Sequence, residues 1–195
     1  MKILLVAVEV APFAKTGGLA DVAGSLPKAL KALGHDVRIM LPAYPWITAG
    51  DFGFKPAGKT VRAEMGSETH LAEISEGKLG EVTVYLVKND FYFDRPEIYG
   101  PPGAGDYPDS ARRFGFLAAA SLEALKSLAF QPEVIHCNDW HTAIIPGLLK
   151  TRYQADPFFK NMRTLYTIHN LGYQGVFPAE DLIDYGLEPW LLTEA

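Results

Sequence analysis

Short runs of consecutive apolar residues alternate along this chain with longer segments of helical periodicity, and this alternation restricts the fold strongly. The first run, residues 3–8, is continuously apolar, as expected for a strand that is buried on both faces. A helical stripe over residues 19–33 and a second apolar run at 37–41 follow it. Because strand–helix–strand units join parallel strands by right-handed crossovers, the sequence predicts a doubly wound, mostly parallel α/β sheet that resembles the Rossmann fold.

The other elements are predicted from the same two periodicities. Residues 59–76 alternate polar and apolar side chains around Gly66 and Ser67, which predicts a small antiparallel insertion. Pro27 predicts a kink or restart in the first helix, because proline lacks a backbone donor. The remaining predictions are a strand at 81–87, an irregular binding segment at 89–108, a helix from 109 capped by Asp109 or Ser110, a strand at 133–137, a helix at 141–153 bent or restarted at Pro146, and a strand at 163–168.

Composition excludes several classes of function. The 195 residues carry 18 basic and 23 acidic side chains, a net charge of −5 that argues against nucleic acid or an anionic membrane as partner. Cys137 is the only cysteine, so an intrachain disulfide and a metal site built on several cysteines are both excluded. The apolar run near the start is too short for a secretory core or a membrane span. We therefore expect a cytoplasmic protein.

Polar residues follow the carboxyl ends of the predicted strands. Ligands bind at that edge of open parallel sheets, because the loops after the strands gather there. The sequence therefore predicts one site built from four distant segments. These segments are Glu9 with residues 15–18 after the first strand, residues 89–108, residues 138–141 and the pair His169 and Asn170.

Lys15, Gly17 and Gly18 directly precede the first helix. Glycines there let backbone N–H groups approach an anion, and the lysine adds positive charge beside the positive end of the helix dipole, so phosphate is the expected ligand. The spacing matches neither the Walker A motif nor the dinucleotide GxGxxG fingerprint. The structural alternative is a simple turn with a solvated lysine.

Asp139 and His169 also have structural alternatives. Asp139 either orients a sugar hydroxyl or caps the helix that follows it. His169 either donates a hydrogen bond to a ligand or satisfies a buried carbonyl group. Asp139, His141 and His169 lack a compact metal-ligand spacing, and Cys137 activated by His169 lacks a third orienting residue, so metal and cysteine chemistry are the weaker hypotheses.

Three ordered motifs carry a family resemblance. They are KTGGLADV at residues 15–22, HCNDWH at 136–141 and TIHNLGYQG at 167–175. With them the chain resembles, over its whole length, the bacterial glycogen synthases and plant starch synthases.

The resemblance implies a retaining glucosyltransferase of the GT-B fold that moves glucose from ADP-glucose, or UDP-glucose, to the nonreducing end of an α-1,4-glucan. It implies no cofactor and no metal. By similarity, Asp139 and His169 are the catalytic residues that contact the transferred glucose. The substrate-binding residues implied are Lys15, Gly17, Gly18, Asp21, Asn170 and Tyr99, with Tyr107 an alternative to Tyr99.

Length is the main departure from the family. The resemblance implies two similar domains facing a cleft, so residues 1–195 correspond to an incomplete amino-terminal, acceptor-side domain that needs the missing carboxy-terminal nucleotide-binding domain. We expect the chain alone to be weak or inactive. The alternatives are a stand-alone glucan-binding or partner module and a small hydrolase using Asp139 and His169.

Overall fold

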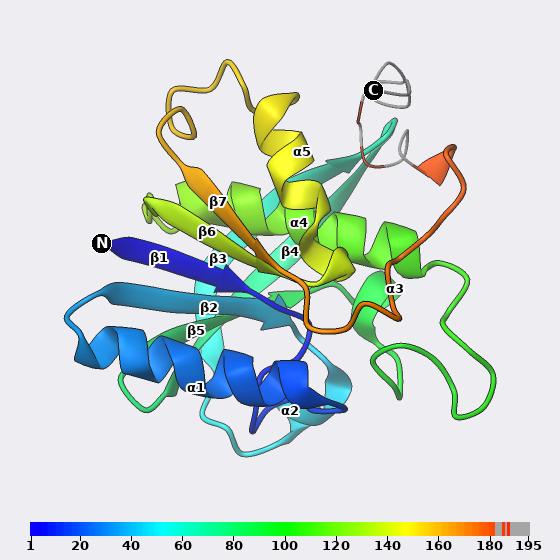
Figure 1. Cartoon of the computed structure of the whole chain (residues 1–195), viewed down its shortest axis with the longest axis horizontal. Helices are drawn as coiled ribbons and strands as arrows, with labels where there is room; N and C mark the ends of the chain where they lie inside the picture. Colours follow the sequence, from blue (N-terminus) through cyan, green and yellow to red (C-terminus); the bar gives the residue numbers. More distant parts are fainter. Residues whose placement is uncertain (182–184, 186, 188–195) are drawn as a thin grey trace.

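A seven-stranded sheet in the order β3-β4-β5-β2-β1-β6-β7 forms the centre of the molecule (Figure 1). The computed structural model describes residues 1–181, 185 and 187. Five strands, from β5 to β7 in this order, are parallel, and β3 and β4 form an antiparallel hairpin on β5. The predicted doubly wound sheet with a small antiparallel part is confirmed. Its strands are β1 (Lys2–Val6), β2 (Asp36–Pro42), β3 (Lys55–Met65), β4 (Glu68–Leu79), β5 (Val82–Lys88), β6 (Val134–Asn138) and β7 (Arg163–Thr167).

Helices cover both faces of the sheet. One face carries α1, which connects β1 to β2, and the other carries α4, which connects β5 to β6 and packs against α5 (Figure 1). This arrangement puts the topological switch point between β1 and β6, where a crevice opens at the carboxyl edge of the sheet. The helices are α1 (Gly18–Ala32), α2 (Pro45–Ala49), α3 (Asp90–Phe93), α4 (Ser110–Ser127), the 3-10 turn η1 (Trp140–Thr142) and α5 (Ile144–Lys150).

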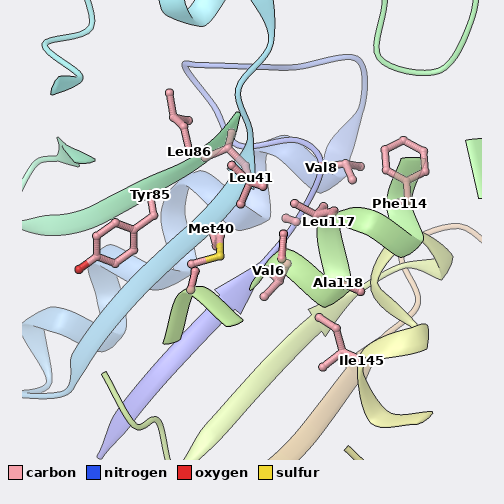
Figure 2. Close-up of a cluster of buried hydrophobic side chains, with 14 of the residues drawn as sticks. Val6, Val8, Met40, Leu41, Tyr85, Leu86, Phe114, Leu117, Ala118 and Ile145 are labelled. Atoms are coloured by element: carbon pink, nitrogen blue, oxygen red, sulfur yellow. The ribbon is translucent and has the colours of Figure 1, made fainter. Parts of the chain in front are cut away.

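The core forms where apolar side chains of the central strands meet α4 and α5. Val6 and Met40, which are paired in register on β1 and β2, are both fully buried. Figure 2 shows them beside Leu117 of α4 and Ile145 of α5. Each such side chain contributes roughly 1.5–3 kcal/mol by leaving water. Because the central strands are covered on both faces, their order and the position of the carboxyl edge are firmly specified.

Proline effects differ from the sequence-based expectation. The helix α1 runs without interruption through Pro27, so the predicted restart is wrong. Pro27 itself is buried in α1 together with Leu19 and Ala23, and this packing outweighs one lost backbone hydrogen bond. After β6 the chain forms the short turn η1 before α5 begins at Ile144. Pro146 therefore lies in the first turn of α5. Backbone N–H groups of a first turn have no acceptor within the helix, so a proline there removes no helical hydrogen bond.

The segment at 89–108 contains one helix that was not predicted. Asn89 caps α3 by accepting a hydrogen bond from the Tyr92 backbone N–H at 3.2 Å. Asp109 precedes α4 but makes no side-chain cap, because its carboxylate instead pairs with Arg95 at 2.9 Å. Asp109, one of the two predicted N-cap residues, thus occupies the N-cap position of α4 without a side-chain cap bond, and its carboxylate anchors the long segment.

Candidate functional site

A cavity of about 620 Å³ opens at the carboxyl edge of the sheet, next to the switch point between β1 and β6. All four segments singled out in the sequence contribute to its wall. The lining residues are Glu9, Thr16, Gly17, Gly18, Leu19, Val22, Tyr99, Asp106, Asp139, Trp140, His141, His169, Asn170 and Tyr173.

The glycine loop forms one side of this cavity. The helix α1 begins at Gly18, so the unpaired N–H groups of its first turn and its positive dipole end lie beside the cavity. A Cβ atom added at Gly17 or Gly18 would meet nothing within 4 Å, and a ligand therefore has room to approach this backbone closely. The geometry suits an anion.

Lys15 and Asp21 lie beside the loop, outside the cavity wall. Lys15 Nζ lies 2.6 Å from Asp21 Oδ1, and both side chains are more than half exposed. Asp21 thus holds the ammonium group near the start of α1 while leaving it accessible. An exposed pair of this kind contributes little to stability, so its position next to the positive end of α1 is the more informative property.

Asp139 has a strained backbone. Its φ of 56° and ψ of 177° fall in a region that residues other than glycine rarely occupy and that costs about 1–3 kcal/mol. The side chain does not cap η1. Instead, its Oδ1 accepts a hydrogen bond from the backbone N–H of His169 at 2.6 Å, across the ends of β6 and β7. Asp139 therefore occupies the N-cap position of η1, as the structural alternative expected, but its carboxylate binds His169 instead of capping the turn.

His169 is oriented by Asn138. The Asn138 side-chain nitrogen donates to the carbonyl oxygens of Val6 and His136, at 3.1 and 3.2 Å, so its Oδ1 is left as an acceptor. His169 Nε2 lies 3.0 Å from that oxygen and donates to it. In the neutral ring, Nδ1 is then an acceptor. The adjacent Asn170 also lines the cavity, and its Oδ1 accepts a hydrogen bond from the Gly172 N–H at 2.9 Å.

The two candidate tyrosines of the long segment have different surroundings. Tyr99 lines the cavity, where its hydroxyl donates to Glu9 and its ring stacks on His141 at 5.2 Å. The Tyr107 ring instead lies against the Arg113 guanidinium, 4.9 Å from its centroid. Tyr107 is not among the residues lining this cavity.

His141 and Glu9 have surroundings that the sequence did not indicate. Burial, with a smaller effect from the Arg113 charge, lowers the pKa of His141 to about 3, so its ring is neutral at pH 7. Neither ring nitrogen has a hydrogen-bond partner among the described residues. The histidine is packed between the rings of Tyr99 and Phe114. Glu9 is only 3% exposed although it lines the cavity, and only its place after a strand could have drawn attention to it.

The surroundings of Cys137 do not favour nucleophilic chemistry. Burial raises the pKa of the Cys137 thiol to about 12, which disfavours the thiolate that a nucleophile requires. Within residues 1–181, 185 and 187, no group of three or more His, Cys, Asp or Glu side chains is placed to hold a metal ion. In that same part of the chain, no helix is both long and apolar enough to cross a membrane.

Comparison with known proteins now gives the family. The family model described as the starch synthase catalytic domain matches residues 2–194. The chain belongs to this family. It is 50% identical over 193 residues to glycogen synthase 2 of Geobacter metallireducens, covering 99% of this chain and 40% of that protein. It is 49% identical over 193 residues to the glycogen synthase of Syntrophotalea carbinolica, covering 99% of this chain and 40% of that protein.

A solved starch synthase structure has the same fold. The catalytic domain of starch synthase IV from Arabidopsis thaliana, bound to ADP and acarbose, matches with a TM-score of 0.87 and 31% sequence identity. The match covers 97% of this chain and 38% of that one. The chain therefore spans about 40% of the length of the two curated glycogen synthases.

Proposed function

We propose that this chain supplies the acceptor-side domain of a retaining glucosyltransferase that moves glucose from ADP-glucose to the nonreducing end of an α-1,4-glucan. The observation that carries the proposal is one cavity whose wall joins the glycine loop, Asp139 and His169. The names of the glycogen synthase relatives and the ADP-bound starch synthase structure agree with it. UDP-glucose is the competing donor.

The proposed role of the glycine loop is to stabilise the departing diphosphate. Negative charge accumulates on the leaving group as the bond to glucose breaks. The first-turn N–H groups of α1 are fixed donors for that charge, and the exposed Lys15 ammonium group, which pairs with Asp21, adds a positive charge beside them. Fixed dipoles stabilise charge without reorganising during the reaction. The diphosphate can therefore leave from the glycine-loop side of the cavity without a separate proton donor.

The proposed role of Asp139, His169 and Asn170 is to hold the transferred glucose. Asp139 uses Oδ1 for the His169 N–H, which leaves Oδ2 to accept from a sugar hydroxyl. In the neutral ring, His169 Nδ1 is a second acceptor, because Nε2 donates to Asn138. The Asn170 amide NH₂ offers a donor. Fixed contacts of this kind hold the reacting carbon in line with the acceptor.

We further propose that residues 1–195 are one incomplete domain and that a second, nucleotide-binding domain closes the cleft. The outermost strand β7 exposes Leu165 and Tyr166, which are 52% and 41% accessible. Exposed apolar residues on an edge strand are normally covered in a finished protein. We place the complete enzyme in the cytoplasm, because the single cysteine of this chain fits a reducing compartment.

A fusion tests this proposal. The chain is assayed alone and after it replaces the matching first part of Geobacter metallireducens glycogen synthase 2. We expect the chain alone to bind ADP-glucose weakly and to transfer little glucose, whereas the fusion elongates maltooligosaccharides and prefers ADP-glucose to UDP-glucose. Robust elongation by the chain alone would show that the second domain is not needed.

Two other results would support the competing functions, and a third concerns the donor alone. A folded fusion that binds glucan but elongates nothing supports a binding module. Release of free glucose or phosphate without an acceptor supports a hydrolase that uses Asp139 and His169. Equal rates with both nucleotide sugars reject the donor preference only.

A further inference from the structure

Glu9 carries a buried carboxylate between two separate loops of the cavity. It follows β1, and its side chain is almost inaccessible to water. Oε2 accepts hydrogen bonds from the backbone N–H groups of Thr16 and Gly17, at 2.5 and 2.9 Å. Oε1 accepts from the Thr16 hydroxyl at 2.8 Å and from the Tyr99 hydroxyl. One carboxylate thus binds the glycine loop and the long segment together.

These four bonds leave Glu9 little capacity for a substrate. An ionised carboxylate has about four lone-pair positions, and four donors already point at them. The pKa of the Tyr99 hydroxyl is raised, first by burial and then by the Glu9 charge, so Tyr99 stays protonated and remains a donor. Glu9 therefore acts on other groups and does not contact the reacting atoms.

The backbone beneath Glu9 is also firmly held. Val10 and Ala14 exchange backbone hydrogen bonds of 2.9 and 3.0 Å, and this bridge closes a tight turn directly after Glu9. Directly before it, the carbonyl of Val8 accepts a bond from the buried Tyr44 hydroxyl at 3.1 Å. These bonds restrain the backbone on both sides of Glu9 and so fix the position of its carboxylate.

The occupied N–H groups determine where an anion can bind. The backbone N–H groups of Thr16 and Gly17 already donate to Glu9. A ligand at this loop must therefore use the N–H groups of Gly18 and of the residues that follow it in α1. We propose that Glu9 is a positioning residue that fixes the glycine loop and Tyr99 in the arrangement that binds the diphosphate of the sugar nucleotide. The part concerning the diphosphate rests on the proposed function.

Two substitutions of Glu9 distinguish its role as a hydrogen-bond acceptor for the two loops from the effect of its negative charge. Glu9→Gln keeps an oxygen for the two backbone N–H groups, and the hydroxyls of Thr16 and Tyr99 can turn to accept from its NH₂ group. Glu9→Leu keeps the volume and removes every acceptor. Tyr44→Phe is the control, because it removes a buried hydroxyl bond next to Glu9, keeps the ring that packs against Phe93, and leaves the four hydrogen bonds of Glu9 in place.

Amide hydrogen exchange of the 195-residue chain is the first measurement. We expect the Thr16 and Gly17 amides to exchange at least about tenfold faster in Glu9→Leu, and within about threefold of the parent in Glu9→Gln and Tyr44→Phe. Unchanged exchange in Glu9→Leu would overturn the proposal. If Glu9→Leu does not fold, Thr16→Val removes one bond, and its Gly17 amide should exchange about threefold faster; no acceleration there would equally reject the proposal.

Kinetics of the fusion protein is the second measurement. Glu9→Leu should raise KM for ADP-glucose at least about tenfold, whereas Glu9→Gln and Tyr44→Phe should leave it within about threefold. If Glu9→Gln loses as much as Glu9→Leu, the charge and not the position matters, and the proposal is wrong. If the parent fusion transfers nothing while the exchange results are as expected, the proposed function fails and the positioning of the loop stands.

Discussion

Asp139 and His169 are joined by a hydrogen bond of 2.6 Å from the His169 backbone N–H to Asp139 Oδ1, although 30 positions separate them in the chain. A second bond, from the Asp139 backbone N–H to the Thr167 carbonyl at 2.9 Å, ties the same two strand ends. Together these bonds hold Asp139 in its unfavourable backbone conformation. The strain is thus maintained by β7 and has a measurable energy.

Replacing Asp139 by glycine and by alanine should reveal that strain. Both variants lose the carboxylate, but only glycine adopts the backbone angles of residue 139 freely. We expect Asp139→Gly to be more stable than Asp139→Ala by about 1 kcal/mol, a difference of roughly 2–4 °C in Tm, although glycine is normally the less stable of the two. Thermal unfolding checks this. Equal stabilities, or a more stable alanine variant, would mean that the site stores no strain.

Lys15→Ala should weaken transfer by the fusion protein. Loss of a charged hydrogen bond to the diphosphate costs about 1.5–3 kcal/mol, or roughly 10- to 150-fold in kcat/KM. The matched control is Lys28→Ala, which removes an exposed lysine further along the same helix α1 and should change little. Steady-state kinetics with varied ADP-glucose measures both. The phosphate role fails if the two variants behave alike.

His169→Ala should lower turnover more than it lowers stability. The side chain is half-buried and makes one hydrogen bond, to Asn138, so we expect a stability loss of about 1 kcal/mol and a turnover loss of about tenfold or more. His35→Ala, just before β2 at the opposite edge of the sheet, serves as control. A large fall in Tm with little change in kcat would instead give His169 a structural role.

Acid should destabilise the chain partly through His141. The folded-state pKa of about 3 lies below the unfolded value of about 6.5, so between these limits the unfolded state binds more protons and stability falls as the pH falls. From pH 7 to pH 5 the loss from this residue is about 2 kcal/mol. Urea unfolding measures the free energy of unfolding at both pH values, and in His141→Phe its decrease from pH 7 to pH 5 should be smaller than in the parent by that amount. Parallel pH profiles for the two proteins would contradict this.

Much of the fold was predictable because its signals are local. The uninterrupted apolar run that becomes β1 requires cover on both faces, and the alternation after it requires parallel strands. The position of the site followed from the same topology, since the carboxyl ends of parallel strands share one edge. The continuous course of α1 through Pro27 was not predictable, because tertiary packing and not local preference decides it.

The details of the site depend on contacts that no local pattern contains. The four hydrogen bonds of Glu9 join residues up to 90 positions apart, and the backbone angles of Asp139 are imposed by the end of another strand. The neutrality of His141 follows from burial between side chains of two other segments. Sequence identifies the polar residues at an edge, but only the folded chain determines which of them face a ligand and which hold others in place.

The order of the strands also determines which part of the cavity wall depends on β7. Glu9 and the glycine loop follow β1, whereas His169 follows β7, which is the outermost strand at its side of the sheet in the described part of the chain. A nascent chain that has completed every strand but β7 lacks His169 and the bond that restrains Asp139. The wall formed by Glu9 and the glycine loop does not depend on that strand, so the pairing of β7 with β6 is the step that adds the Asp139 and His169 side of the cavity.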